Sequence, residues 1–399
     1  MTFKRLAVAA LAASGLAASG TASAISAQFG DTEFSLGGYI KLDALYTNYS
    51  VGPVPSNRGR QFTIPSIVPV GDGDSEGALD LSARESRFNF KTVTTTDRHR
   101  FTSFIELDFL DAAFDGDLAN EERLVNGSNP RLRHAFVSWG MPTGGELLLG
   151  QTWSTFMELA AYPDLLDFIG PAQGMTFIRQ PMVRYTRGRL QVALENPDAT
   201  IQGNVNTGQA GGFVDQSELP DLTAKMQLVA SDRTLLTLAG LVRQIDAGNS
   251  ADTGDDTAMG YGVSLSGRQK FGMDDIRFQF NFGDGIGRYL GLNAARGAVL
   301  DDNGELETIQ AMGGYVAYRH FWSQRWRSNI ALGYFSADNE TRFSGEAVTE
   351  TISSAQANLL YSPVTAFTIG GELMFHQREL ENGADGHQTR LQFSAMYAF

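Results

Sequence analysis

The sequence predicts an all-β protein, a 16-stranded antiparallel transmembrane β-barrel with short periplasmic turns, long external loops and a third loop folded inward. Three observations support this fold. The chain ends in an aromatic alternating strand, it begins with a secretory signal, and its polar inserts alternate between short and long.

The last ten residues, 390–399, alternate between an apolar and a more polar face, and the chain stops at Phe399. A soluble sandwich strand alternates too, with its apolar face inside. A final strand that closes on Phe, in a chain with a signal peptide, is instead typical of a bacterial outer-membrane barrel. There the apolar face contacts lipid and the polar face lines the lumen.

The first residues have the pattern of a secretory signal peptide. Lys4 and Arg5 precede an apolar stretch at 6–18, and a small-residue cleavage site ends at Ala24. The apolar stretch is too short for a transmembrane anchor helix, which is the alternative. We expect residues 1–24 to be the signal peptide, with cleavage after Ala24 or else Ala27, and residues 25–399 to form the barrel.

The inserts between the alternating stretches have two lengths, short and long, and the two lengths alternate along the chain. The short ones predict tight turns and lie at 95–98, 142–145, 187–189, 231–233, 272–274, 323–325 and 362–364. The long ones lie at about 50–79, 111–130, 157–177, 197–219, 246–259, 284–307, 337–349 and 380–386. These connections join 16 strands, with turns on one side of a membrane and loops on the other. A soluble β-sandwich, the alternative, has no reason to sort its loops in this way.

Charged residues fall on the polar face of each alternating stretch, as Lys41 and Asp43 do where they alternate with Ile40, Leu42 and Ala44. A lipid-facing Lys or Arg costs roughly 2–4 kcal/mol at the membrane midplane, so the register is strongly set. Arg133 and His134 are neighbours, so one of them is expected to face outward or to lie at the rim.

The composition limits the function classes. The formal net charge of −14 argues against nucleic-acid binding. There is no cysteine, and the five histidines are scattered without a metal-binding spacing, so neither a metal nor a cofactor is expected. No Ser-His-Asp set, paired-carboxylate signature or GxSxG motif indicates catalytic residues.

The polar faces of the strands carry more basic than acidic residues. The basic ones are Lys41, Arg87, Lys91, Arg133, Arg184, Lys225, Arg243, Arg268, Lys270, Arg277, Arg327, Arg378 and Arg390. The acidic ones are Asp43, Glu85, Glu106, Asp108, Glu195, Asp221 and Glu372. A basic lumen would attract anions, because arginine binds carboxylates in a bidentate fashion. Alternatively, these charges pair with one another and select nothing.

The third long insert, 157–177, is more apolar than an exposed loop would be and carries Glu158, Asp164 and Asp167. It is expected to fold into the barrel, with its acids facing wall arginines such as Arg179 and Arg184 across a constriction. The alternative is a surface loop covered by a partner subunit. The full candidate set for the basic side is Arg179, Arg184, Arg87, Lys41, Arg133, Arg243, Arg277, Arg327 and Arg390.

Several short motifs resemble those of a known family. They are Gly-Tyr-Ile-Lys-Leu-Asp at 38–43, Ala-Arg-Glu-Ser-Arg-Phe at 83–88, Gly-Gln-Thr-Trp-Ser-Thr-Phe at 150–156, Arg-Gln-Pro at 179–181 with Arg184-Tyr185, Gly-Asp-Gly-Ile-Gly-Arg-Tyr at 283–289 and His-Phe-Trp at 320–322. In these the chain resembles the DcaP-like trimeric porins of Gram-negative bacteria.

The resemblance implies a homotrimer in the outer membrane, in contact with the lipid bilayer and lipopolysaccharide. It also implies passive diffusion of small hydrophilic solutes, with a preference for small anions and with dicarboxylates as the substrate class. Two other classes remain open from the residues alone: a barrel enzyme of the protease or phospholipase type, and a structural or adhesive barrel.

Overall fold

The computed structural model describes residues 25–55, 60–110, 127–214, 217–248 and 257–399. The predicted signal peptide, residues 1–24, lies outside the described residues. Within them, no helix is both long and apolar enough to cross a membrane.

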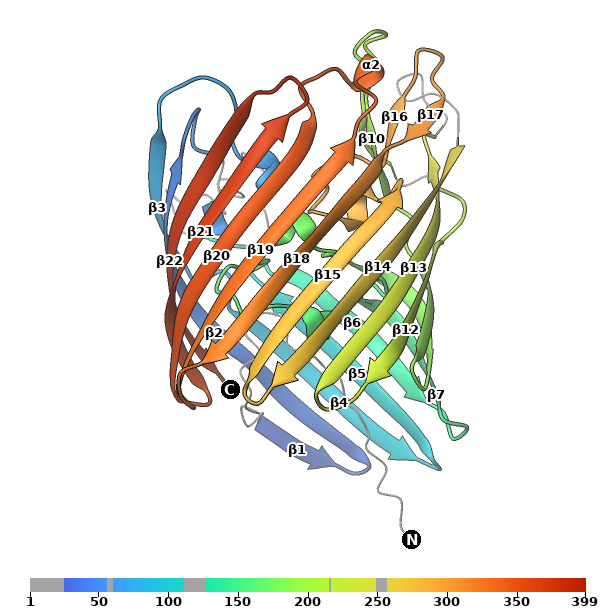
Figure 1. Cartoon of the computed structure of the whole chain (residues 1–399). Coiled ribbons are helices and arrows are strands. Elements are labelled where there is room, and N and C mark those ends of the chain that lie inside the picture. The colour runs from blue at the N-terminus through green and yellow to red at the C-terminus, as the bar shows by residue number, and fades with distance from the viewer. Residues whose placement is uncertain (1–24, 56–59, 111–126, 215–216, 249–256) are drawn as a thin grey trace.

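The main sheet closes on itself as an antiparallel barrel of sixteen strands (Figure 1). Its second strand is interrupted at 83–86 and so counts as two segments, β3 and β4. The strands are β2 (Thr32–Tyr49), β3 (Glu76–Ser82) with β4 (Arg87–Thr96), β5 (His99–Asp108), β6 (Arg131–Gly140), β7 (Gly145–Trp153), β8 (Arg179–Arg187), β9 (Leu190–Glu195), β12 (Asp221–Ala230), β13 (Thr234–Asp246), β14 (Thr257–Phe271), β15 (Asp274–Asp284), β18 (Gln310–Phe321), β19 (Trp326–Asp338), β20 (Thr349–Val364), β21 (Phe367–Leu380) and β22 (Asp385–Ala398). The predicted fold class is confirmed.

The barrel closes between β2 and β22, which pair from Tyr39↔Ala398 to Tyr49↔Gln388. Phe399 completes this seam, because its backbone N–H donates to Gly38 O at 3.1 Å and its carbonyl accepts from Gly38 N at 3.2 Å. Below the seam, the lower part of β2 pairs with an additional short strand, β1 (Ile25–Phe29).

Short turns lie at one end of the barrel together with β1 and the C-terminus, and the long loops lie at the other end (Figure 1). The turn expected at 362–364 is misplaced, since β20 continues to Val364 and the reversal falls at 365–366. The loops carry a small separate sheet of β10 (Ala199–Gln202), β11 (Gly212–Val214), β16 (Ala298–Leu300) and β17 (Leu306–Thr308), and a short helix α2 (Thr341–Ser344).

The two faces of the barrel wall are inverted relative to a soluble protein. Large apolar side chains such as Leu42, Phe280 and Leu391 are exposed on the outside, whereas the inward positions hold polar groups such as Thr47, Gln279 and Asn358. This arrangement is the one that a hydrocarbon exterior and a hydrated lumen require.

Candidate pore constriction

The third loop, which we call L3 (residues 154–178), lies inside the barrel, as predicted (Figure 1). Nearly all of it is buried. Its apolar side chains pack in two directions: Tyr162, Ile169 and Met175 belong to one buried cluster with Tyr315 of the wall, whereas Leu165 clusters with Ala317 and Ala331. The hydrophobic character of the segment is therefore explained by burial against the inner wall.

L3 approaches the wall so closely at one point that only glycine fits. A Cβ on Gly174 would lie 2.0 Å from the backbone carbonyl oxygen of Gly314, whereas one on Gly333 would meet only the movable end of the Gln173 side chain, Nε2, at 2.3 Å. The short helix η4 (Ala172–Gly174) thus rests directly on the backbone of β18 and β19.

The tip of L3 is held by a buried carboxylate on β21. Glu372 accepts hydrogen bonds from the backbone N–H groups of Leu166 (2.7 Å) and Asp167 (3.1 Å), and from Asn358 Nδ2 (2.8 Å). Lys41 on β2 donates from Nζ to the Leu166 carbonyl at 2.7 Å. Hydrogen bonds to charged groups are among the stronger ones, so these contacts fix the position of the tip.

The three acids of L3 are already paired with the wall behind the loop. Asp164 lies 2.7 Å from Arg327 Nε and Asp167 lies 3.6 Å from Arg390 Nη1. Glu158 lies 3.7 Å from Lys225 Nζ. The prediction that these acids would face Arg179 and Arg184 named the wrong partners, because L3 turns its acids toward β12, β19 and β22.

Two further members of the candidate basic set also hold loops in place. Arg277 donates to the Tyr162 carbonyl in L3 and pairs with Asp275 at 2.7 Å. Arg243 donates to the Asp198 carbonyl at 2.6 Å in the fourth loop. Together with Lys41, Arg327 and Arg390, these side chains form the group that we call the loop-holding cations.

The remaining members of the set lie on the arc of wall from β4 to β8. Arg87 (β4), Arg133 (β6) and Arg179 and Arg184 (β8) are joined there by Arg131. Asp108 receives two hydrogen bonds from Arg131, at 2.9 and 2.7 Å, and one from Arg133 at 2.9 Å. We call this group the β4–β8 arginine arc.

A β-bulge brings Arg133 into the arc. Glu106 pairs with His134, whereas the next residue, Leu107, pairs with Leu132, so Arg133 is the extra residue in β6. Both Arg133 and His134 are consequently buried on the inner side. The expectation that one of them faces outward or lies at the rim is wrong, because a bulge breaks the strict alternation of faces.

The tip of L3 presents an aromatic ring to this arc. The ring centroid of Phe168 lies 5.9 Å from the guanidinium carbon of Arg87, 5.5 Å from that of Arg131 and 5.3 Å from that of Arg133. Phe62 of the first loop packs against the same ring at 5.6 Å. A cation–π arrangement of this kind orients guanidinium groups without neutralising their charge.

Arg179 and Arg184 differ from the loop-holding cations. Arg179 stacks on Trp153 at 4.7 Å, and Arg184 donates to the Trp153 carbonyl at 3.4 Å. Over the described ranges of the chain, neither has a carboxylate within 4.0 Å, and Arg179 Nη1 is buried without a hydrogen-bond partner. These two cations are thus held by an aromatic face and a carbonyl rather than by an ion pair.

Sequence reasoning missed Arg319, which pairs with Asp275 and lies 3.4 Å from Asp164. The inward positions of its strand, β18, include Ala311, Gly313 and Ala317, which are hardly more polar than the outward residues. The sequence therefore shows no alternation of polarity that would identify the inward face of β18. Arg131 was missed as well, although it shares the parity of Arg133 in the sequence.

The closed barrel, the sorted turns and loops and the inward L3 define a porin-type outer-membrane barrel. A family model described as DcaP outer membrane protein matches residues 6–399. The chain therefore belongs to the DcaP outer membrane protein family and is located in the outer membrane of a Gram-negative bacterium.

Comparison with solved structures agrees on the fold. The outer membrane channel DcaP of Acinetobacter baumannii superposes with a TM-score of 0.76 at 23% sequence identity, over 93% of this chain and 99% of that one. An anion-selective porin from Comamonas acidovorans (TM-score 0.57, 11% identity, 92% and 100% covered) is also similar. So is Salmonella typhi OmpF in complex with daunomycin (TM-score 0.57, 11% identity, 94% and 100% covered). A search of curated proteins found no match.

Proposed function

We propose that this protein is a diffusion channel for small hydrophilic solutes that prefers anions, with dicarboxylates as the favoured class. Passage is passive and follows the concentration gradient. The observation that carries the anion preference is the pair Arg179 and Arg184, which have no carboxylate partner among the described residues.

The positions of the three acidic residues of L3 support this proposal. Glu158, Asp164 and Asp167 are each paired with a wall cation. Their negative charge is therefore compensated behind the loop. In the β4–β8 arginine arc, Arg87, Arg131 and Arg133 are paired with Glu106 or Asp108, and the excess positive charge is that of Arg179 and Arg184. The two sides of the proposed constriction therefore differ in their electrostatic character.

The two cations on β8 lie at different heights along the strand. Arg179 and Arg184 are five residues apart on one strand, which corresponds to roughly 16 Å between their Cα atoms at about 3.3 Å per residue. Arg184 has the inward parity of Gln180 and Met182, whereas Arg179, at the start of β8, has the opposite parity but stacks on Trp153, which is buried in a cluster with L3 residues. We infer from these contacts that both guanidinium groups are accessible from the lumen, at different heights. Weak binding at successive positions allows passage, whereas one tight site would trap the solute.

Solute flux into liposomes tests the proposal. We expect succinate to enter several-fold faster than a neutral diol of similar size, and a diamine of similar length to enter more slowly than either. Equal rates for the dianion and the diamine would contradict the anion preference, and no flux of any solute would contradict the channel itself. A barrel enzyme, the competing class, would show no solute flux in this assay.

We infer that residues 1–24 are removed on export, so that the intact mass of the mature protein corresponds to a chain that begins at Ile25. A mass that begins at Gln28 would place cleavage after Ala27 instead. We also infer a homotrimer, which is tested below.

A further inference from the structure

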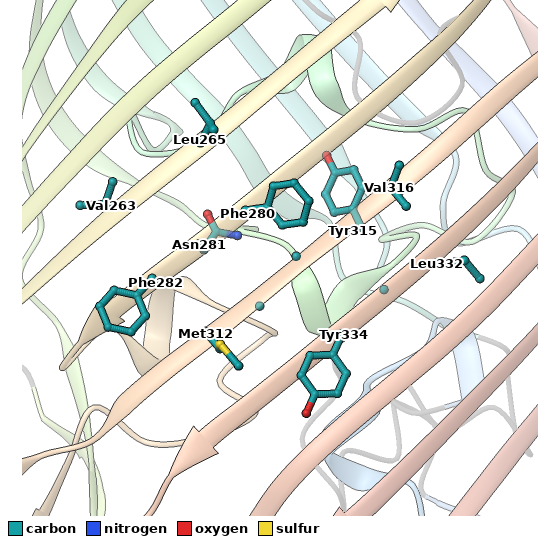
Figure 2. Close-up of a pocket in the computed structure, with 13 residues that line it drawn as sticks. Val263, Leu265, Phe280, Asn281, Phe282, Met312, Tyr315, Val316, Leu332 and Tyr334 are labelled. Carbon is teal, nitrogen blue, oxygen red and sulfur yellow. The ribbon is translucent and has the colours of Figure 1, made fainter.

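The outer wall of the barrel carries an apolar groove whose lining residues take no part in the proposed solute path. It has a volume of about 670 Å³ and lies over β14, β15, β18 and β19. Figure 2 shows Phe280, Phe282, Met312, Val316, Leu332 and Tyr334 around it.

The floor of the groove is formed by glycine. Gly314 occupies the outward position between Met312 and Val316 on β18, and a Cβ there would lie 2.5 Å from Phe280 Cδ1. On the other side of the same wall, η4 rests on Gly313 and Gly314. At this point only the glycine backbone of β18 separates L3, on the inside of the wall, from the groove on the outside.

The rim of the groove is high. Phe280, Met312, Leu332 and Tyr334 surround the glycine floor, and each is about half exposed. The outer wall of a second barrel is convex and would be held away from the floor by these side chains. A thin, flexible hydrocarbon chain can pass between them and reach it.

The position of the groove also matches a lipid. Tyr261 and Tyr334 lie in the loop-side parts of β14 and β19, as the interfacial aromatic residues of outer-membrane barrels do. The groove extends from this level toward Val316 and Leu265, that is, into the apolar belt. A lipid whose headgroup lies beside these tyrosines would place the first part of its acyl chain in the groove.

We propose that this groove is a binding site for one acyl chain of an outer-leaflet lipid. The occupant is held by shape and apolar contact, because the residues that line the groove in the described part of the chain carry no charge. The proposal is independent of solute selectivity, since none of the lining residues named here belongs to the arginine arc.

Photolabelling tests the site on the full-length mature protein in detergent. The probe is one equivalent of a phospholipid with a diazirine at mid-chain, and labelled peptides are mapped by mass spectrometry. We expect labelling of residues 310–336 to exceed that of β21 and β22 by several-fold. Leu332→Trp should reduce it at least five-fold, whereas Leu332→Ala, which widens the groove, should retain it.

Leu373→Trp is the matched control, because Leu373 is an outward leucine of β21 with an exposure of 55% against 53% for Leu332. It should leave the labelling of 310–336 unchanged. Equal labelling of both faces would show ordinary lipid contact and overturn the proposal. A photoreactive amino acid at position 332 that crosslinks two copies of the chain would also overturn it, because the occupant would then be a second copy.

Discussion

Replacing Arg179 by glutamine should lower the preference for anions without disturbing the barrel. Arg179 has no ion-pair partner among the described residues, so its removal leaves no carboxylate uncompensated. The principal interaction that the substitution removes is the stacking on the buried Trp153 at 4.7 Å, a type of interaction that contributes about 0.5–1 kcal/mol at exposed sites and about 2 kcal/mol where the pair is desolvated.

The expected magnitude follows from Coulomb's law. One unit charge at about 4 Å from an anion contributes about 1 kcal/mol in a fully hydrated pore, and more where water is partly excluded. About 1 kcal/mol corresponds to a roughly five-fold change in the ratio of chloride to potassium permeability. Reversal potentials across a KCl gradient in planar bilayers measure that ratio.

The matched control is Arg342→Gln, which removes the same charge from an exposed position where the side chain is 74% accessible. It should leave the ratio unchanged at about 0.1 M salt, because the Debye length there is about 10 Å. If Arg179→Gln and Arg342→Gln behave alike, Arg179 does not lie along the permeation path, and the reasoning from its lack of a carboxylate partner is wrong.

Four other outcomes are expected. Arg184→Glu should shift selectivity toward cations and slow dicarboxylate flux several-fold, and an unchanged reversal potential at low salt would exclude Arg184 from the constriction. Asp164→Asn leaves Arg319 and Arg327 without their L3 partner, and because breaking a buried pair costs about 3–5 kcal/mol, thermal unfolding should occur at lower temperature and single-channel currents should become noisier. Deleting Phe399 removes the backbone pairing with Gly38 at the seam, so the amount of barrel in the outer membrane should fall, and normal levels would contradict this role. On a native gel the unheated protein should migrate at three times the mass of the boiled chain, whereas a monomer before boiling would refute the trimer.

The architecture was predictable because it depends on features that repeat along the chain. Sixteen alternating stretches and the sorting of short and long inserts specify the strand number and the sidedness. The turn after β20 was misplaced, since residues 362–364 resemble a turn in composition although the strand continues through them. Neither β1 nor the interruption of the second strand at 83–86 was anticipated.

The site was predictable only in part, because its details depend on how segments distant in sequence meet. The apolar composition of 157–177 indicated an inward loop, but the side of the lumen toward which its acids turn depends on the path of L3. The adjacent Arg133 and His134 break the residue alternation, but the sequence does not show that a β-bulge places both of them on the inner side. The sequence did not identify Arg319 as inward-facing, because the inward and outward residues of its strand differ little in polarity.

The sign of the reversal potential of the wild-type channel tests the central claim most directly. Across a tenfold KCl gradient at low salt, an anion-preferring lumen should give the sign of a chloride-permeable pore. The preference should weaken near about 1 M salt, where the Debye length falls to about 3 Å. A potential of the opposite sign at low salt would contradict the proposal that Arg179 and Arg184 give the channel its preference for anions.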